Sequence, residues 1–341
     1  MQDEDFESIM KSITSKLTGD IEKDMSYLLE QSNKYKNHKY GKEVTRACGR
    51  LLYEIMPDNM KKEFDAAVNK DVKAFDAAFE EVQFQMYKKK YGKALELLES
   101  MIYHYEELDL YDEDEVSCYF DFKEPFEEIL YMQIYDPQKE IRRAQIKYSD
   151  LYCLYGSLLL ELNRYEEAEW ALRKGMKWNP INAKIAFEHA ETYKVRGMFD
   201  EFYNATKDIY KIAFHSDYLA RYYRNLGYYF IEKNEMQLAV YCYLFSLNFE
   251  ESERVQSEIY YISQMDRTIN LDINLDMIQN AFTTHGIPFG PDHNIIGMAY
   301  ELTKLSIEDD NKENAKYYLS IILEFYENEE LLSLKSLIEK M

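Results

Sequence analysis

Large apolar residues recur along the chain at steps of three, four and seven positions, as an amphipathic α-helix with one buried stripe requires. One such series is Tyr155, Leu159, Leu162, Tyr165 and Leu172. The chain has only 6 Pro and 11 Gly among 341 residues, so few positions would break a helix. The pattern therefore predicts an all-α fold, and Pro180 marks a place where one helix ends.

Comparing the sequence with itself shows an internal repeat. The tetrapeptide Lys-Tyr-Gly-Lys opens the segments 39–52 and 90–103, and an amphipathic pattern follows it in both. In the longer pair 154–180 and 225–252, a small residue is followed by Ala and then by a large apolar residue at matching distances. A stretched copy lies near the C-terminus, and the three triplets are Gly156/Ala168/Leu172, Gly227/Ala239/Tyr243 and Ala299/Ala315/Leu319.

These triplets have a physical explanation in close helix packing. Small residues such as Gly156 and Ala168 remove side-chain bulk, so two antiparallel helices can approach to the short end of the usual 8–10 Å separation. We expect the large residue of each triplet to fill the space toward the neighbouring hairpin. The repeated unit is therefore predicted to be a helical hairpin.

At this point the chain resembles the tetratricopeptide repeat family, whose unit is a helix-turn-helix of 34 residues. The best match is 149–182, and 220–253 follows through Tyr223, Leu226, Gly227, Phe230, Ala239, Tyr243 and Ser246. In 149–182 the signature positions are taken by Tyr152, Tyr155, Gly156, Leu159, Ala168, Leu172 and Pro180. The resemblance implies an α-α superhelix, a right-handed solenoid of helical hairpins.

The repeat units suggest a division of the chain into four parts. We expect N-terminal hairpins in 1–108 (units 24–57 and 75–108), an acidic connection in 109–148, a repeat array in 149–287 (units 149–182, 183–216, 220–253 and 254–287) and a hairpin with a capping helix in 288–341. Within residues 105–128, eleven acidic residues stand against one lysine. That stretch is either a solvated connection, as a loop or an irregular helix, or an acidic-aromatic docking element for a basic partner.

Charge and cysteine usage limit the partners and the compartment. The net charge of −22 argues against nucleic acid as the main ligand, because phosphate binding needs a concentrated positive face. No apolar run approaches a membrane span, and the opening MQDEDFESIM has no export signal, so we expect a cytoplasmic protein that binds no membrane. The four cysteines are far apart and form no CxxC pair, which fits reduced thiols.

No pattern in the sequence indicates catalysis, and we expect no catalytic residues, no metal and no cofactor. The chain lacks a phosphate-binding glycine loop, GxSxG and HExxH. His285, Asp292 and His293 flank a Gly/Pro-rich turn without enough further ligands for a metal site. An enzyme on a helical-repeat frame would have to use Glu188, His189 and Glu191, and position 189 is expected to face the hairpin interior.

Binding is the function that the resemblance implies, because such arrays line a concave groove with the first helix of each hairpin. The groove positions in this sequence are Lys184, Phe187, Glu188, Glu191, Arg221, Arg224, Asn225 and Tyr228. We expect a non-catalytic scaffold that binds another protein or a peptide there, and the sequence leaves the oligomeric state open. The alternative is a regulator that responds to a signalling peptide and is similar to the peptide-pheromone receptors of Gram-positive bacteria.

Overall fold

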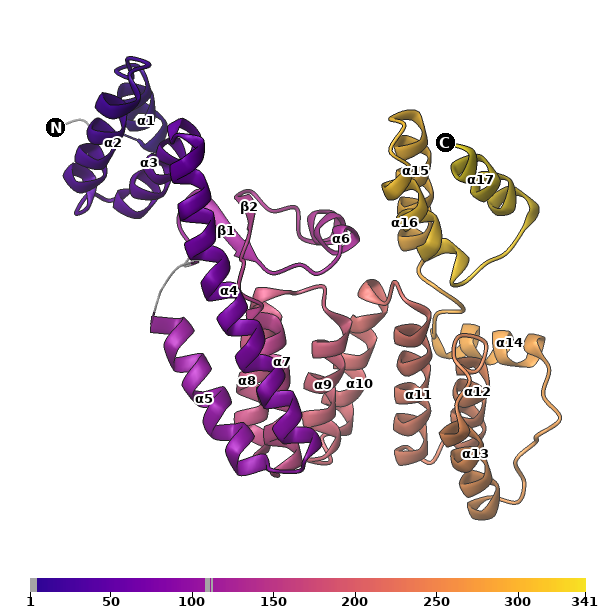
Figure 1. Cartoon of the computed structure of the whole chain (residues 1–341). Helices are drawn as coiled ribbons and strands as arrows, with labels where there is room; N and C mark the ends of the chain where they lie inside the picture. Colours follow the sequence, from indigo (N-terminus) through magenta and orange to yellow (C-terminus); the bar gives the residue numbers. More distant parts are fainter. Residues whose placement is uncertain (1–4, 108–110, 112) are drawn as a thin grey trace. The chain divides into compact units, whose positions relative to one another are not determined.

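The computed structural model describes residues 5–107, 111 and 113–341, and these residues form an almost entirely helical chain (Figure 1). They contain seventeen α-helices, one short 3-10 helix and one two-stranded sheet. The all-α prediction is therefore confirmed, and consecutive helices pack against one another as in helical-repeat proteins. The chain divides into two compact units, residues 1–121 with 135–151 and residues 122–134 with 152–341.

The first unit contains five helices before the sheet. They are α1 (Phe6–Thr14), α2 (Ile21–Tyr35), α3 (Gly41–Ile55), α4 (Asp58–Tyr87) and α5 (Tyr91–Glu107). Helices α2 and α3 pack together and α1 lies against α3, around a core that includes Ile9, Leu28, Val44 and Cys48. Helices α4 and α5 form a second pair. Both Lys-Tyr-Gly-Lys segments lie at the start of a helix, α3 and α5, as the repeat predicts.

Gly41, in the first of these segments, is required by a close approach of the backbone. A Cβ atom at this position would lie 2.6 Å from the carbonyl oxygen of Lys36 and 2.7 Å from that of Tyr35. Its counterpart Gly92 has open space around the same position. The repeated glycine therefore has a packing role in the first copy and none in the second.

A small sheet lies in the predicted acidic connection. Strands β1 (Ser117–Phe120) and β2 (Glu140–Arg143) pair in parallel, with Ser117 opposite Glu140. Helix α6 (Pro125–Tyr135) connects them in sequence, as a parallel crossover requires. The sequence analysis did not predict these strands, because each is only four residues long and neither shows a clear alternation of apolar and polar positions.

Acidic residues of this segment hold the sheet in place within the first unit. The buried Asp114 carboxylate accepts a hydrogen bond from the Arg46 guanidinium at 2.6 Å and from the backbone N–H groups of Val116 and Ser117. Burial by itself would raise the pKa of Asp114, but these hydrogen bonds outweigh it and lower the pKa. Part of the acidic run is therefore structural.

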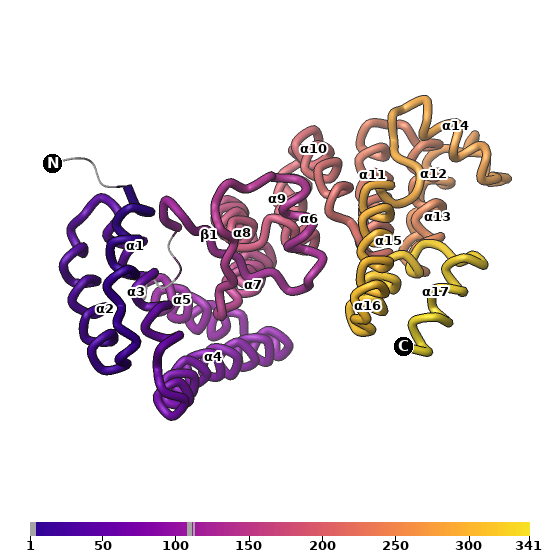
Figure 2. The backbone as a smooth tube through the Cα atoms, turned by 90° about the horizontal axis from the view of Figure 1, so that it is seen from above, coloured from indigo at the N-terminus to yellow at the C-terminus, as the bar shows by residue number. Residues whose placement is uncertain are grey.

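Most of the segment predicted to form a repeat array, 149–287, lies in the second unit. Its helices are α7 (Tyr148–Glu161), α8 (Tyr165–Trp178), α9 (Ala183–Lys194), α10 (Phe199–Ile209), α11 (Ser216–Glu232), α12 (Met236–Ser246), α13 (Glu253–Met265), α14 (Leu275–His285), α15 (His293–Glu308), α16 (Lys312–Leu323) and α17 (Glu329–Lys340), with the 3-10 turn η1 (Tyr210–Ile212). Helix α7 begins in the first unit. Helices α9 and α10, α11 and α12, and α15 and α16 form packed pairs, and α17 lies against α16 (Figure 2).

The glycines of the triplets allow close packing, and the side chain that packs against each of them is the large residue of the same triplet. The Leu172 side chain occupies the space beside Gly156, and the Tyr243 ring occupies the space beside Gly227. Leu172 also clusters with Ile185 of α9, so it contacts the neighbouring hairpin as predicted. The large residue of the triplet therefore joins the two helices of its own hairpin as well as the next one.

Helices α13 and α14 depart from a regular hairpin. Both pack against α12, and Figure 1 shows α14 lying across the end of α12 and not along α13. The connection between them is held by Gln237 on α12, whose side-chain amide donates to the Asn270 carbonyl and accepts from the Asn270 N–H. As a result, α14 does not cover α13 in the way that the second helix of a repeat would.

The described part of the chain has no helix that combines the length and the apolar character needed to cross a bilayer.

Candidate binding groove on α9 and α11

The predicted groove residues come from two helices of the second unit. Helix α9 begins after Asn182, whose side-chain oxygen accepts a hydrogen bond from the Ile185 N–H. It carries Lys184, Phe187, Glu188 and Glu191, and α11 carries Arg221, Arg224, Asn225 and Tyr228. Steps of three and four residues place members of each set on one side of their helix.

The structure brings four of these residues into one pocket of about 360 Å³. They are Lys184 and Phe187 from α9 and Arg221 and Arg224 from α11. The remaining lining residues, which the sequence analysis missed, are Asp217, Tyr218 and Glu250. Asp217 and Tyr218 lie one helical turn before Arg221 and could have been found by extending the same stripe. Glu250 lies beyond the end of α12, and no local pattern places it here.

Each arginine of the pocket is held by a carboxylate. Arg221 Nη2 lies 3.0 Å from Glu188 Oε1, and Arg224 Nη1 lies 2.7 Å from Glu250 Oε2. The Arg221 guanidinium also lies over the Phe187 ring, 4.7 Å from its centroid. Because these ion pairs are partly exposed to water, each is worth about 1 kcal/mol or less. A ligand carboxylate can therefore compete with Glu188 and Glu250 for the arginines.

Two other side chains of the pocket offer hydrogen-bond donors. Lys184 is exposed, and no acceptor within the described residues is paired with its amine. Burial, with a smaller effect of the Asp217 carboxylate, raises the pKa of Tyr218 to about 12. The Tyr218 hydroxyl thus remains protonated near neutral pH.

The other predicted residues lie outside this pocket. Asn225 is buried, and its amide donates to the Thr206 hydroxyl at 3.4 Å. Lys194 pairs with Glu191 at 2.6 Å and lies 5.0 Å from the centroid of the Tyr228 ring. Lys194 therefore joins Glu191 of α9 and Tyr228 of α11 in a separate contact, whereas Asn225 belongs to the interior.

The residues of the enzymatic alternative are not brought together as an acid-base set. Glu188 pairs with Arg221 and Glu191 pairs with Lys194. The partly buried His189 ring lies edge-on to Tyr193, and its Nε2 has no hydrogen-bond partner among the described residues. Burial lowers the pKa of His189, and Arg173 lowers it further.

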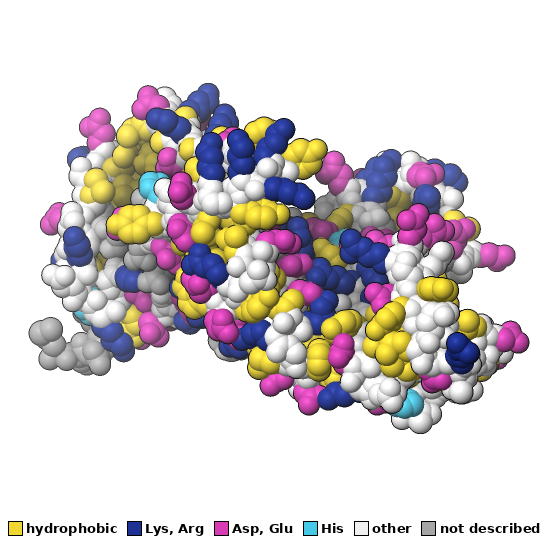
Figure 3. Space-filling model, turned by 90° about the horizontal axis from the view of Figure 1, so that it is seen from below, with side chains coloured by type: hydrophobic (Ala, Val, Ile, Leu, Met, Phe, Trp, Pro, Cys, Tyr) yellow, Lys and Arg dark blue, Asp and Glu magenta, His cyan; other side chains and the backbone are white. Residues whose placement is uncertain are grey.

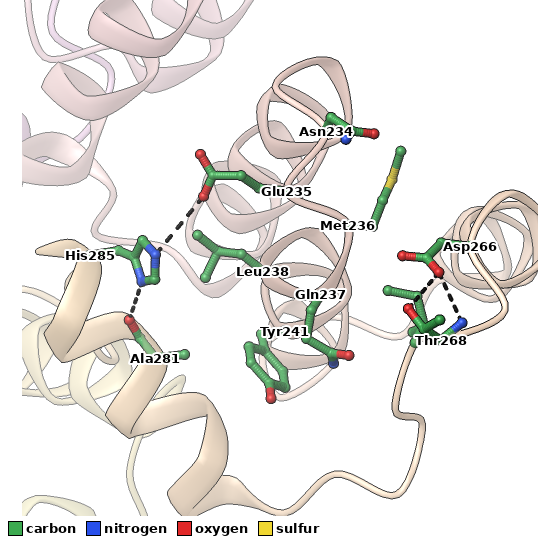
Figure 4. A pocket seen from close by; sticks show the side chains of 11 residues that line it. Asn234, Glu235, Met236, Gln237, Leu238, Tyr241, Asp266, Thr268, Ala281 and His285 are labelled. Atoms are coloured by element: carbon green, nitrogen blue, oxygen red, sulfur yellow. Dashed lines mark hydrogen bonds and ion pairs between the residues drawn. The ribbon is translucent and has the colours of Figure 1, made fainter.

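A second pocket, of about 440 Å³, lies at the start of α12 (Figure 4). It is bounded by α12, by the loop that follows α13 and by α14. Its lining residues are Asn234, Glu235, Met236, Gln237, Leu238, Tyr241, Asp266, Thr268, Ile269, Ala281 and His285. His285 Nε2 lies 3.9 Å from Glu235 Oε2, which is a loose contact. The sequence analysis did not predict this pocket.

Charge on the molecular surface is mixed. The face drawn in Figure 3 carries acidic, basic and hydrophobic side chains interspersed, with a row of lysine and arginine side chains along one edge. In residues 5–107, 111 and 113–341, no group of three or more His, Cys, Asp or Glu side chains could hold a metal ion.

Comparisons with known proteins do not assign the chain to a family. No protein-family model matches it, and no curated protein is similar enough to count as a relative. The chain is an all-helical protein whose neighbouring helices pack in pairs, which is compatible with a helical-repeat fold.

Proposed function

We propose that this chain is a non-catalytic scaffold of the tetratricopeptide type, a superhelical repeat protein that binds an extended segment of another protein or a peptide along α9 and α11. The observation that carries the proposal is the pocket in which Lys184, Arg221 and Arg224 lie together. Three cationic side chains gather there although the whole chain has a net charge of −22. Together in one pocket, they suit an acidic side chain of the bound segment.

The polarity of the groove supports an orientation for the bound segment. Its acidic residue would bind at Arg221 and Arg224, where it competes with Glu188 and Glu250. Near the other end of α9, Glu191 and the Tyr228 ring already contact Lys194 of the same chain, so a basic residue of the ligand would have to displace Lys194 there.

The proposal is tested by affinity capture from a lysate of the native cell. The variant Lys184→Ala/Arg221→Ala/Arg224→Ala removes the cations of the pocket. Its control, Lys177→Ala/Lys207→Ala/Lys211→Ala, removes the same charge from other positions of the second unit. We expect a protein that binds the wild type and the control and is lost with the pocket variant. Capture that does not differ between the two variants would contradict a binding site at this pocket.

A second experiment, which uses the segment identified by capture, separates the scaffold from the peptide-responsive regulator. If a short synthetic peptide derived from the captured segment changes the X-ray scattering profile of the protein, binding is coupled to a change of conformation. A scaffold would bind the peptide with an unchanged profile.

A further inference from the structure

Helix α13 leaves part of its surface without a covering helix. Val255 and Ile262 are buried against the array, whereas Tyr260, Tyr261 and Met265 are each more than half exposed. We call these three exposed residues the α13 face. In a regular repeat, the next helix along the chain would cover such a face, but α14 packs against α12 instead. The α13 face is therefore apolar surface that the described fold does not bury.

The surroundings of the α13 face are acidic. Between residues 251 and 276, six Asp or Glu residues stand against Arg254 and Arg267. Two further large apolar side chains, Leu271 and Leu275, are more than half exposed in the same segment. An apolar face with an acidic border favours a partner that combines apolar and basic side chains.

The pocket of Figure 4 continues this surface. Asp266, which lines the pocket, directly follows Met265 of the α13 face. Figure 4 shows Glu235 and Asp266 on opposite sides of the pocket, with Gln237 and Tyr241 of α12 between them. Asp266 is ionised near neutral pH, because hydrogen bonds from the Thr268 hydroxyl and N–H lower its pKa.

This combination suits a lysine or arginine side chain. The aliphatic stem would contact Met236, Leu238 and Ile269, and the charged end would lie between the carboxylates of Glu235 and Asp266. Among the described residues that line the pocket, His285 is the only basic one; it is exposed and lies 3.9 Å from Glu235. A cationic ligand therefore displaces no close ion pair at this position.

We propose that the α13 face and the adjoining pocket dock a basic amphipathic segment of another protein. Its apolar side chains lie against Tyr260, Tyr261 and Met265, and a lysine or arginine enters the pocket beside Glu235 and Asp266. This surface differs in residues and in charge from the groove on α9 and α11. A second copy of the chain is the less suitable occupant, because two acidic borders would repel each other.

The test uses the full chain and a synthetic amphipathic helix of leucine and lysine as the probe. A second probe has glutamate at every lysine position. One variant, Tyr261→Ser/Met265→Ser, removes apolar contacts, and its control is Leu305→Ser, an exposed leucine on α15. Another variant, Glu235→Gln/Asp266→Asn, removes the charge of the pocket, and its control is Glu313→Gln/Glu327→Gln, two exposed carboxylates of the C-terminal part.

We expect the lysine probe to bind the wild type and the glutamate probe to fail. The variant of the α13 face and the variant of the pocket each bind the lysine probe at least tenfold more weakly than the wild type does. Each control variant binds it with an affinity within about twofold of the wild type. Binding by Lys184→Ala/Arg221→Ala/Arg224→Ala stays at the wild-type level, which separates this surface from the groove.

Three results would overturn the proposal. One is the absence of binding of the lysine probe to the wild type. The second is an equal loss of affinity in the variants and their controls, which would indicate attraction to the overall negative charge. The third is a wild-type dimer in sedimentation experiments that Tyr261→Ser/Met265→Ser dissociates, because the occupant would then be a second copy.

Discussion

The side chain of Leu172 lies directly against the backbone of Gly156, so a Cβ atom on Gly156 would be 2.4 Å from Leu172 Cγ. Tyr243 has the same relation to Gly227, where a Cβ would be 2.8 Å from the ring. The repeated pattern of a glycine followed by a large residue thus records a direct contact between two helices.

This contact predicts that Gly156→Ala and Gly227→Ala destabilise the protein. The added methyl group overpacks the hairpin, which typically costs about 1–3 kcal/mol in the free energy of unfolding. Urea denaturation followed by circular dichroism measures this. Gly297→Ala on α15 is the control, because a Cβ there meets open space and the substitution favours a helix. Equal midpoints for Gly156→Ala and the wild type would contradict the overpacking argument.

His215 predicts a pH-dependent contribution to stability. Its ring lies between two carboxylates, with Nδ1 2.9 Å from Glu324 Oε1 and Nε2 3.0 Å from Glu124 Oε1. Burial by itself would lower the pKa of His215, but the two carboxylates outweigh it and raise the pKa to about 10. Replacing the histidine by glutamine leaves two carboxylates without their cation. We expect His215→Gln to lower the free energy of unfolding, measured by urea denaturation, by about 2 kcal/mol near pH 6.

The sign of this pH dependence follows from the direction of each shift. A raised pKa means that the His215 contribution is complete below pH 6.5 and is lost as the pH rises toward 10. Hydrogen bonding to His215 lowers the pKa of Glu124. Burial by itself would raise the pKa of Glu324, but hydrogen bonds from His215 and from the Ser216 N–H outweigh burial and lower it. The contributions of the two carboxylates are complete above pH 4.5 and are lost in acid. The stability difference between the wild type and His215→Gln is thus largest between pH 4.5 and 6.5, and a constant difference up to pH 10 would contradict it.

The Tyr223 hydroxyl is hydrogen-bonded to the Gly/Pro-rich turn, so we expect its removal to lower the free energy of unfolding. It donates to the Pro288 carbonyl at 2.8 Å and accepts from the Gly290 N–H at 3.0 Å. Tyr223→Phe leaves these backbone groups unpaired, which we expect to cost about 1–3 kcal/mol in thermal or urea unfolding. Tyr222→Phe is the matched control, because that ring is equally buried. The prediction fails if both substitutions have the same effect.

The four cysteines predict slow thiol chemistry in the folded state. Cys48, Cys118, Cys153 and Cys242 are all buried thiols. Burial raises the pKa of Cys48, Cys118 and Cys242, so little thiolate is present near pH 8. Ellman's reagent should react slowly with the native protein and with all four thiols after unfolding in guanidinium. A thiol that reacts at once in the native protein would show that its site opens.

The groove on α9 and α11 illustrates how far the sequence could predict a site. Helical spacing put Lys184 and Phe187 on one face and Arg221 and Arg224 on another, and the structure brings the four together. Asn225 satisfied the same spacing but is buried against Thr206, because the position of α10 decides which side of α11 faces inward. Spacing gives the face of a single helix, and the neighbouring helices determine whether that face is open.

The sequence alone established the helical character of the chain, the starts of α3 and α5 and the small residues at which helices pack closely. These properties depend on periodicity, chain breakers and side-chain volume, which are local. The pairing of β1 with β2, the packing of α14 on α12 and the meeting of Glu124, His215 and Glu324 are visible in the three-dimensional structure alone. Such contacts join residues that are far apart in sequence, and they follow from how whole helices and strands pack, which no local pattern encodes.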